Sequence, residues 1–498
     1  MEEMKENGMP PLAPEAPAAE PWFVARRGEW MFCAVCLICG LCLANFVLYG
    51  GFNLGFAVAG LVLTVATTLY LVARGYKLTA YPAALLALSV VILAGFGRSD
   101  DGFVKFVMLC FLTLAENLSL CLLAGKNRRD PGSFSTLWDA PMVLFSMGLE
   151  KMQLSMQSLR ISMKRSGKLG RVSGGLMAGL LISMPLLIVV VVLLMRADAA
   201  FSGLIAQLPK LDFAAVLGTA AFGAMAFCFV FTRGVALHYS VMPPLAKKSR
   251  KGVYPLTVNT VLVTLCLVYI LYLVSQLAYF TGGLSGILPE EFTMAEYARR
   301  GFFEMAVLSG INLCTVAIAV AVVAKKEKTP LFTRLLCLFI SLITLFFVVA
   351  ASAKMGLYIG SYALSRLRLL TEVIMVFLAI TTILVAVWLF VPKMPYMKAV
   401  LIVALVMGAV VLWVDVDTVV AAYNVSAYQN GLIHWVDVDY LTTLSDGAVP
   451  YIEKLVNDAN PQVAQQASSF INMSRIFVDD FRDWNYATWI ASMIAGGR

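Results

Sequence analysis

The chain has 498 residues, of which 60% are hydrophobic and only 14% are charged. Soluble domains usually carry about 25% charged residues, so this composition excludes a water-soluble fold. The net charge of +8 does not by itself indicate a nucleic-acid partner, because Lys and Arg also accumulate on the cytoplasmic side of membrane proteins. We therefore expect the lipid bilayer as the main partner and no nucleic acid.

Residues 1–28 are rich in Pro, Ala and Glu and lack a hydrophobic period, which indicates a disordered cytoplasmic tail. Four apolar segments of bilayer-crossing length follow within residues 29–125, and seven more lie within residues 176–414. The eleven segments are 30–49, 54–73, 81–97, 103–124, 176–195, 213–237, 255–280, 302–324, 331–353, 369–391 and 397–414. The sequence thus predicts an all-α, polytopic integral membrane protein with about eleven transmembrane helices.

The orientation follows from the basic residues. With the N-terminus in the cytoplasm, most of the 38 Lys and Arg residues fall in cytoplasmic segments and few in external loops. An odd number of spans then places residues 415–498 outside, as a small helical extracytoplasmic tail. All ten cysteines lie in apolar segments, so disulfides outside the membrane are excluded.

The cytoplasmic loop at 126–175 contains an amphipathic helical pattern between Asp139 and Arg165. Its apolar stripe has alternating spacings of three and four, at Met142, Phe145, Leu149, Met152, Met156, Leu159 and Met163. Basic residues accompany it, which favours contact of residues 139–171 with an anionic lipid surface. The alternative is a Met-rich docking face for a membrane protein partner.

Motifs of soluble enzymes are absent from the sequence. It has no phosphate-binding glycine loop, no G-x-S-x-G elbow and no H-E-x-x-H, so we name no catalytic residue. The two histidines, His238 and His434, fall on opposite sides of the predicted membrane and cannot share a metal. We expect no metal site and no cofactor.

Glu116 and Asn117 lie deep in the fourth apolar segment. An ionisable group at membrane depth is costly and is a default functional hypothesis. We interpret the pair as a candidate intramembrane proton or cation site, with a structural hydrogen bond between helices as the alternative.

A second candidate group gathers at the outer starts of two later segments. Its members are Glu296, Arg299, Arg300, Glu304, Arg366, Arg368 and Glu372. Residues four positions apart lie side by side on a helix, so ordinary salt bridges such as one between Arg368 and Glu372 would explain these charges. The functional hypothesis is an anion-recognition cluster, because guanidinium groups bind phosphate or carboxylate bidentately.

The tail repeats Val-Asp-Val-Asp, with carboxylates at Asp415 and Asp417 and again at Asp437 and Asp439. A calcium site is one hypothesis for these residues. The pattern lacks the remaining ligands of a calcium loop, so the sequence supports it only weakly.

The run Tyr-Ala-Arg-Arg-Gly-Phe-Phe-Glu, which ends at Glu304, resembles the signature of an uncharacterised family of bacterial polytopic membrane proteins known only as a domain of unknown function. Arg196-Ala-Asp198, Gly356-Leu-Tyr-Ile-Gly and the stretch from Asp417 to Leu441 resemble the same family, over roughly residues 170–460. The resemblance implies a multi-pass protein of the bacterial cytoplasmic membrane without an established activity.

Three functions remain open from the sequence. The favoured one is non-enzymatic sensing, scaffolding or partner binding. The second is a transporter or flippase-like carrier of an anionic or lipid-like substrate, and the third is a membrane-embedded transferase with a carboxylate base. An enzyme is the less favoured class, because no catalytic motif is found.

Overall fold

The computed structural model describes residues 21–165, 190, 213–241, 253–283, 294–323, 329–474, 476, 478 and 480–495. Its regular elements are all helical in these residues. Nine of the described helices are long and apolar enough to cross a membrane, which confirms the predicted all-α polytopic fold. The predicted fifth span, 176–195, lies outside the described residues apart from residue 190.

Ten of the eleven predicted spans coincide with described helices. They are α1 (Arg27–Gly50), α2 (Leu54–Ala73), α3 (Ala80–Gly95), α4 (Gly102–Leu123), α9 (Phe213–Tyr239), α10 (Pro255–Gly283), α11 (Met294–Val323), α12 (Leu331–Tyr362), α13 (Arg366–Phe390) and α14 (Tyr396–Val414). Helix α3 has 16 residues and is the shortest of them. At 1.5 Å per residue it rises about 24 Å, less than the bilayer core of about 30 Å.

Two helices important for the site begin at polar caps. Asp101 accepts hydrogen bonds from the backbone N–H groups of Phe103 and Val104 at the start of α4. Ser365 accepts one from the N–H of Arg368 at the start of α13. Such caps satisfy the free N–H groups of a first helical turn and fix where the helix begins.

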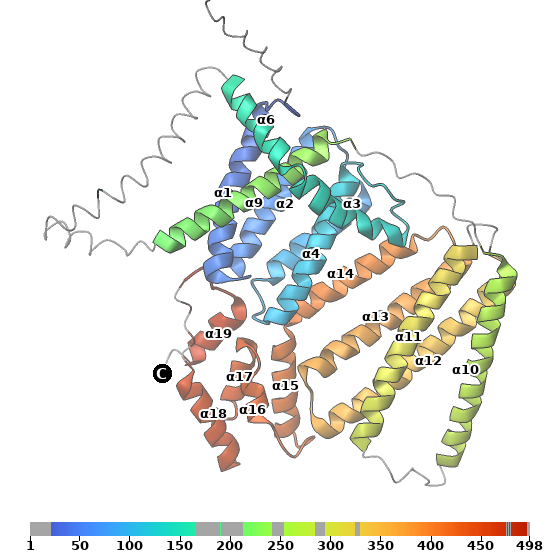
Figure 1. Ribbon diagram of the computed structural model, residues 1–498. Coiled ribbons are helices and arrows are strands. Elements are labelled where there is room, and N and C mark those ends of the chain that lie inside the picture. Colours follow the sequence, from blue (N-terminus) through green and yellow to red (C-terminus); the bar gives the residue numbers. More distant parts are fainter. Residues whose placement is uncertain are drawn as a thin grey trace, which may run out of the picture.

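The spans form two groups (Figure 1), with α1 to α4, α9 and α14 on one side and α10 to α13 on the other. Each group has its own apolar clusters, around Leu118 and Phe231 in the first and around Ile340 and Phe347 in the second. Helix α14 packs against α3 and α4 and also borders α13. It therefore joins the two groups.

The predicted amphipathic helix is interrupted. The chain forms α5 (Asp139–Met142), a π-helical turn, η2 (Val143–Leu149), and then α6 (Met152–Arg165). A π-helical turn holds one extra residue and shifts the apolar face. Met147 and Leu159 are therefore buried against the first group, while Phe145 and Leu149 of the predicted stripe are exposed.

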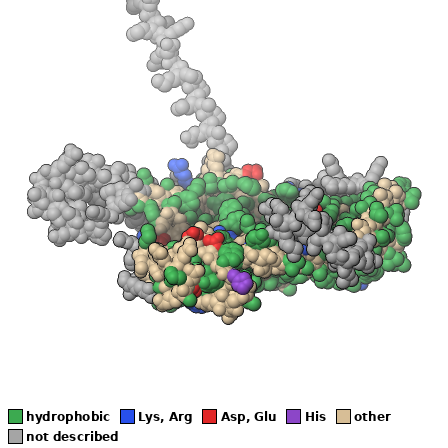
Figure 2. All heavy atoms as spheres, turned by 90° about the horizontal axis from the view of Figure 1, so that it is seen from below, with side chains coloured by type: hydrophobic (Ala, Val, Ile, Leu, Met, Phe, Trp, Pro, Cys, Tyr) green, Lys and Arg blue, Asp and Glu red, His purple; other side chains and the backbone are tan. Residues whose placement is uncertain are grey.

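The tail, defined as residues 415–495, lies on one side of the spans (Figure 1). Its longer helices are α15 (Val416–Gln429), α18 (Pro461–Met473) and α19 (Tyr486–Ala495), with α16 (Val438–Thr442) and α17 (Val449–Glu453) as short turns between them. Buried Val425, Ile452 and Leu455 belong to a separate apolar core. Figure 2 shows this face, where polar and acidic atoms gather on the tail and hydrophobic atoms dominate the spans beside it.

The tail is joined directly to the spans. Helix α14 ends at Val414 and α15 begins at Val416, so Asp415, with φ of 61°, is the only residue between them. Further along, the N–H of Tyr486 donates to the carbonyl of Gly97 at 2.9 Å, and the N–H of Leu54 to the carbonyl of Trp484 at 3.2 Å. The end of the tail is thereby fixed to two loops of the first group.

Candidate functional site

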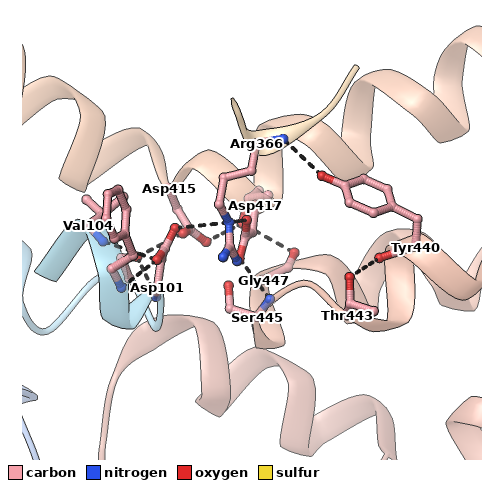
Figure 3. Close-up of polar contacts among 12 residues, drawn as sticks. Asp101, Val104, Arg366, Asp415, Asp417, Tyr440, Thr443, Ser445 and Gly447 are labelled. Atoms are coloured by element: carbon pink, nitrogen blue, oxygen red, sulfur yellow. Dashed lines mark hydrogen bonds and ion pairs between the residues drawn. The ribbon is translucent and has the colours of Figure 1, made fainter. Parts of the chain in front are cut away.

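A network of buried charges lies where α4 and α13 begin and α14 ends (Figure 3). Arg366 directs its guanidinium at both oxygens of Asp417, with Nε 2.8 Å from Oδ1 and Nη2 bonded to Oδ2. Its Nε also lies 3.5 Å from Oδ2 of Asp101. The side chains of Asp417 and Asp101 are 0% and 1% exposed and that of Arg366 is 31% exposed. One arginine thus pairs with two buried carboxylates from different parts of the fold and balances one of their two charges.

Backbone groups complete this pairing. The N–H of Ser445 donates to Oδ2 of Asp417 at 2.8 Å, and the N–H of Arg366 donates to the Tyr440 hydroxyl at 2.9 Å. Buried ion pairs are tolerated when hydrogen bonds satisfy the remaining polar atoms. The arrangement connects α13 to α15 and α16 of the tail, and Ser445 holds the Asp417 carboxylate within the tail.

Asp415 is held by two hydroxyl groups. Ser99 donates to its Oδ1 at 2.8 Å and Thr418 to its Oδ2 at 2.5 Å. Burial raises the pKa of the Asp415 carboxyl, and these hydrogen bonds oppose the rise. A Cβ atom on Gly447 would collide with Asp415 and Thr418, so any larger residue there would force these side chains to shift.

Asp100 and Lys105 extend the network toward α2. Asn485 donates to Oδ1 of Asp100 at 3.2 Å, and Lys105 donates to Oδ1 of Asn53 at 2.5 Å. Burial, together with the charges of Asp446 and Asp415, raises the pKa of Asp100 to about 6, against the opposing effects of Lys105 and Asn485. The tail contact therefore includes a carboxyl group whose pKa, at about 6, lies well above the usual range.

The chemistry of the network is that of a structural joint. Arg366 already holds Asp417 and Asp101, and Asp415 accepts bonds from two hydroxyls. A general base needs access to a substrate proton, whereas Asp101, Asp415 and Asp417 are each at most 2% exposed. Among the described residues, no group of three or more His, Cys, Asp or Glu could hold a metal ion.

The predicted cluster of seven residues is divided in the structure. Arg366 belongs to the buried network, whereas Arg368 lies over the Tyr358 ring at 4.1 Å from its centroid. Within the described part of the chain Arg368 makes no ion pair, so the spacing-based pairing with Glu372 is not observed. Glu296, Arg299 and Arg300 lie on α11 with side chains outside the described set, and Glu304 is exposed.

Glu116 and Asn117 face an arginine of another span. Nη2 of Arg233 lies 2.9 Å from Oε1 of Glu116, and Nη1 lies 3.2 Å from Oδ1 of Asn117. The side chains of Arg233 and Glu116 are 7% and 15% exposed. Arg233 lies inside α9, within the predicted span 213–237, where it compensates the glutamate charge.

The buried carboxylate of Glu29 was not predicted from the sequence. Glu29, in the first turn of α1, is 0% exposed, forms an ion pair with Arg74 and accepts a hydrogen bond from the Tyr239 hydroxyl at 2.9 Å. The only hint in the sequence is that a glutamate directly precedes the first apolar segment, 30–49. Glu29 joins α1, α2 and α9 at the end of the bundle far from the tail.

These features define a polytopic α-helical membrane protein with a folded tail joined to its spans by a buried ion pair and hydrogen bonds. The chain belongs to the family described as Domain of unknown function (DUF4153), whose model matches residues 23–455. The matched range also includes the first four spans, whereas the resemblance noted in the sequence covered only residues from about 170 onward. No curated protein and no solved structure matches the chain.

Proposed function

We propose that the protein is a non-enzymatic component of the bacterial cytoplasmic membrane that senses or binds a partner through its tail. The observation that carries the proposal is the joint itself. The tail has its own apolar core, and Arg366 and Asp415 connect it to the spans without a linker. A domain held in this way can present a surface and pass a change in that surface to the spans.

The proposed orientation has the tail outside and the N-terminus in the cytoplasm, as the distribution of basic residues favours. Leu432 in the tail and Leu78 between α2 and α3 are 76% and 45% exposed. Single cysteines at these positions should react differently with a membrane-impermeant maleimide on intact cells. Labelling of Leu432→Cys alone agrees with the orientation, and labelling of Leu78→Cys alone reverses it.

The partner itself is tested by photo-crosslinking in native membranes. Met473, on α18, is 81% exposed and can carry the photoreactive residue, with Leu78 as the control position. A discrete cross-linked protein should appear from position 473 and vanish when Leu432 is changed to Asp. Identical products from positions 473 and 78 would contradict a partner surface on the tail.

A lipid-like substrate is the second candidate, and one cavity favours it. An apolar cleft of about 410 Å³ lies between α4, α13 and α14, within the range of ligand pockets. On α13 its lining runs from Leu367 to Phe377, about 15 Å along the helix, or half of the bilayer core. This length fits an acyl chain of one leaflet.

A carrier function predicts that filling the cleft stops lipid movement. Ala404 lines the cleft, whereas Val410 on the same helix is 54% exposed outside it. In vesicles, Ala404→Phe should abolish the transfer of a labelled phospholipid between leaflets, while Val410→Phe should retain it. Equal rates for the two variants, or no transfer by the unaltered protein, would remove this candidate.

Contact of residues 139–171 with anionic lipid remains part of the proposal. Exposed Phe145 and Leu149 on η2 support it, because both could enter the interface beside the basic residues. Binding to vesicles with and without anionic lipid, compared between the unaltered protein and Phe145→Ser, tests this contact. Unchanged binding would refute it.

A further inference from the structure

A second cavity lies where the tail meets the turn between α12 and α13. It has a volume of about 240 Å³ and is lined by Tyr362, Ser365, Arg368, Trp435, Asp437 and Tyr440, among others. The first three residues come from the spans and the last three from the tail. A ligand in this cavity would contact both parts of the molecule.

Of the described residues that line this cavity, Arg368 is the only basic one. Its Nη1 donates to the carbonyl of Tyr362 at 2.6 Å and to that of Ala363, so the guanidinium is fixed at the end of α12. Among the described residues no carboxylate lies within ion-pair distance of it. This differs from Arg366, two residues earlier, whose charge is neutralised by Asp417 and Asp101.

The cavity wall is held in place before any ligand arrives. Asn424 clamps the backbone of Leu364, accepting from its N–H and donating to its carbonyl, both at 2.8 Å. The adjacent Ala363 has φ of 61°, a conformation that costs energy for a residue with a Cβ atom. Strained backbone of this kind often occurs at binding sites, where it positions groups in advance.

Two features favour an anion. Among the described residues the charge of Arg368 has no carboxylate partner, and the N-terminus of α13, which begins at Arg366, adds positive potential. The ring of Trp435 is 47% exposed, and Tyr440 is half-buried, so an apolar portion of the ligand can lie against them. Asp437 opposes an anion, although its carboxylate is engaged with the N–H of Tyr440 at 2.9 Å.

We propose that this cavity binds a phosphate group, with Arg368 as its main ligand. The phosphate belongs either to a lipid headgroup or to a soluble phosphate compound. Both sources are compatible with a site at the boundary of a membrane span. The inference goes beyond partner binding, and its test uses the purified protein alone, so either can fail without the other.

The test compares three variants with two probes. Calorimetry measures inorganic phosphate binding to the protein in detergent, and native mass spectrometry measures anionic phospholipid retained from nanodiscs of defined composition. Arg368→Gln should weaken binding of the active probe about tenfold or more, because a charge-assisted pair is lost. Binding of inorganic phosphate identifies a soluble source, and retention of phospholipid without it identifies a headgroup.

Asp437→Asn provides a test that misfolding cannot imitate. Asparagine keeps the cap of α16 but removes a negative charge from the rim, so affinity should rise several-fold. Asp439→Asn is the matched control, since Asp439 is exposed two residues away and is not among the residues that line the cavity. Equal affinities of these two variants, unchanged binding by Arg368→Gln, or binding of neither probe would overturn the proposal.

Discussion

Replacement of Arg366 by Gln tests whether the charge network joins the tail to the spans. The substitution leaves Asp417 and Asp101, which are 0% and 1% exposed, without their cation. Removal of one partner from a buried pair costs about 3–5 kcal/mol, and we expect the lower end because Arg366 is partly exposed. A loss of about 3 kcal/mol corresponds to roughly a 100-fold change in an equilibrium constant.

Hydrogen exchange of the α15 amides measures this loss where it occurs. Exchange should accelerate about 100-fold in Arg366→Gln if the helix opens by undocking. Lys393→Gln, at an exposed position between α13 and α14, is the control and should leave exchange unchanged.

The sign of a second substitution provides the sharper test. Asp417→Asn should speed exchange in the unaltered protein, since it breaks the pair. It should slow exchange in the Arg366→Gln protein, since it removes a buried charge that has lost its partner. The same sign in both backgrounds would refute an electrostatic joint.

Three further predictions concern other parts of the fold. Glu116→Gln should lower the thermal stability of the purified protein by leaving Arg233 unpaired, and adding Arg233→Gln should restore part of the loss. A double variant less stable than either single variant would refute a stabilising ion pair between the two residues. Because burial raises the pKa of Asp100 to about 6, the folded protein binds a proton at this carboxyl more strongly than the unfolded chain does. The free energy of unfolding should therefore fall as the pH rises from 3.8 to about 6. A melting series in which Asp100→Asn shows the same pH dependence as the unaltered protein would contradict this. Gly447→Ala should speed hydrogen exchange in α15 by forcing Asp415 and Thr418 apart. Gly356→Ala is the control and should leave the exchange rates unchanged, because nothing lies within 4 Å of a Cβ atom there. Equal exchange rates in the two variants would refute the steric argument.

The span architecture was predictable because hydrocarbon length and composition determine it segment by segment. Helix α2, for example, begins and ends at the predicted residues, Leu54 and Ala73. The interruption of the amphipathic helix by η2 was not predictable, because hydrophobic spacing does not reveal one extra residue in a turn.

The charge pairs were less accessible to sequence reasoning. Spacing rules describe neighbours on one helix, whereas Arg366 pairs with Asp417 across 51 positions and Arg233 with Glu116 across 117. The Val-Asp-Val-Asp repeat drew attention to Asp415 and Asp417 as calcium ligands, whereas the structure pairs Asp417 with Arg366 and holds Asp415 by the hydroxyls of Ser99 and Thr418. Only the folded chain brings them together with Asp101.

The single residue between α14 and α15 has a mechanical consequence. Asp415 fixes the angle between the last span and the tail through its backbone conformation and its bonds to Ser99 and Thr418. Rotation of the tail would therefore exert torque on α14, and through α14 on both groups of spans. A flexible insertion after Val414 should remove this direct coupling and leave the Arg366–Asp417 pair and the backbone contacts of Trp484 and Tyr486 as the connections between tail and spans.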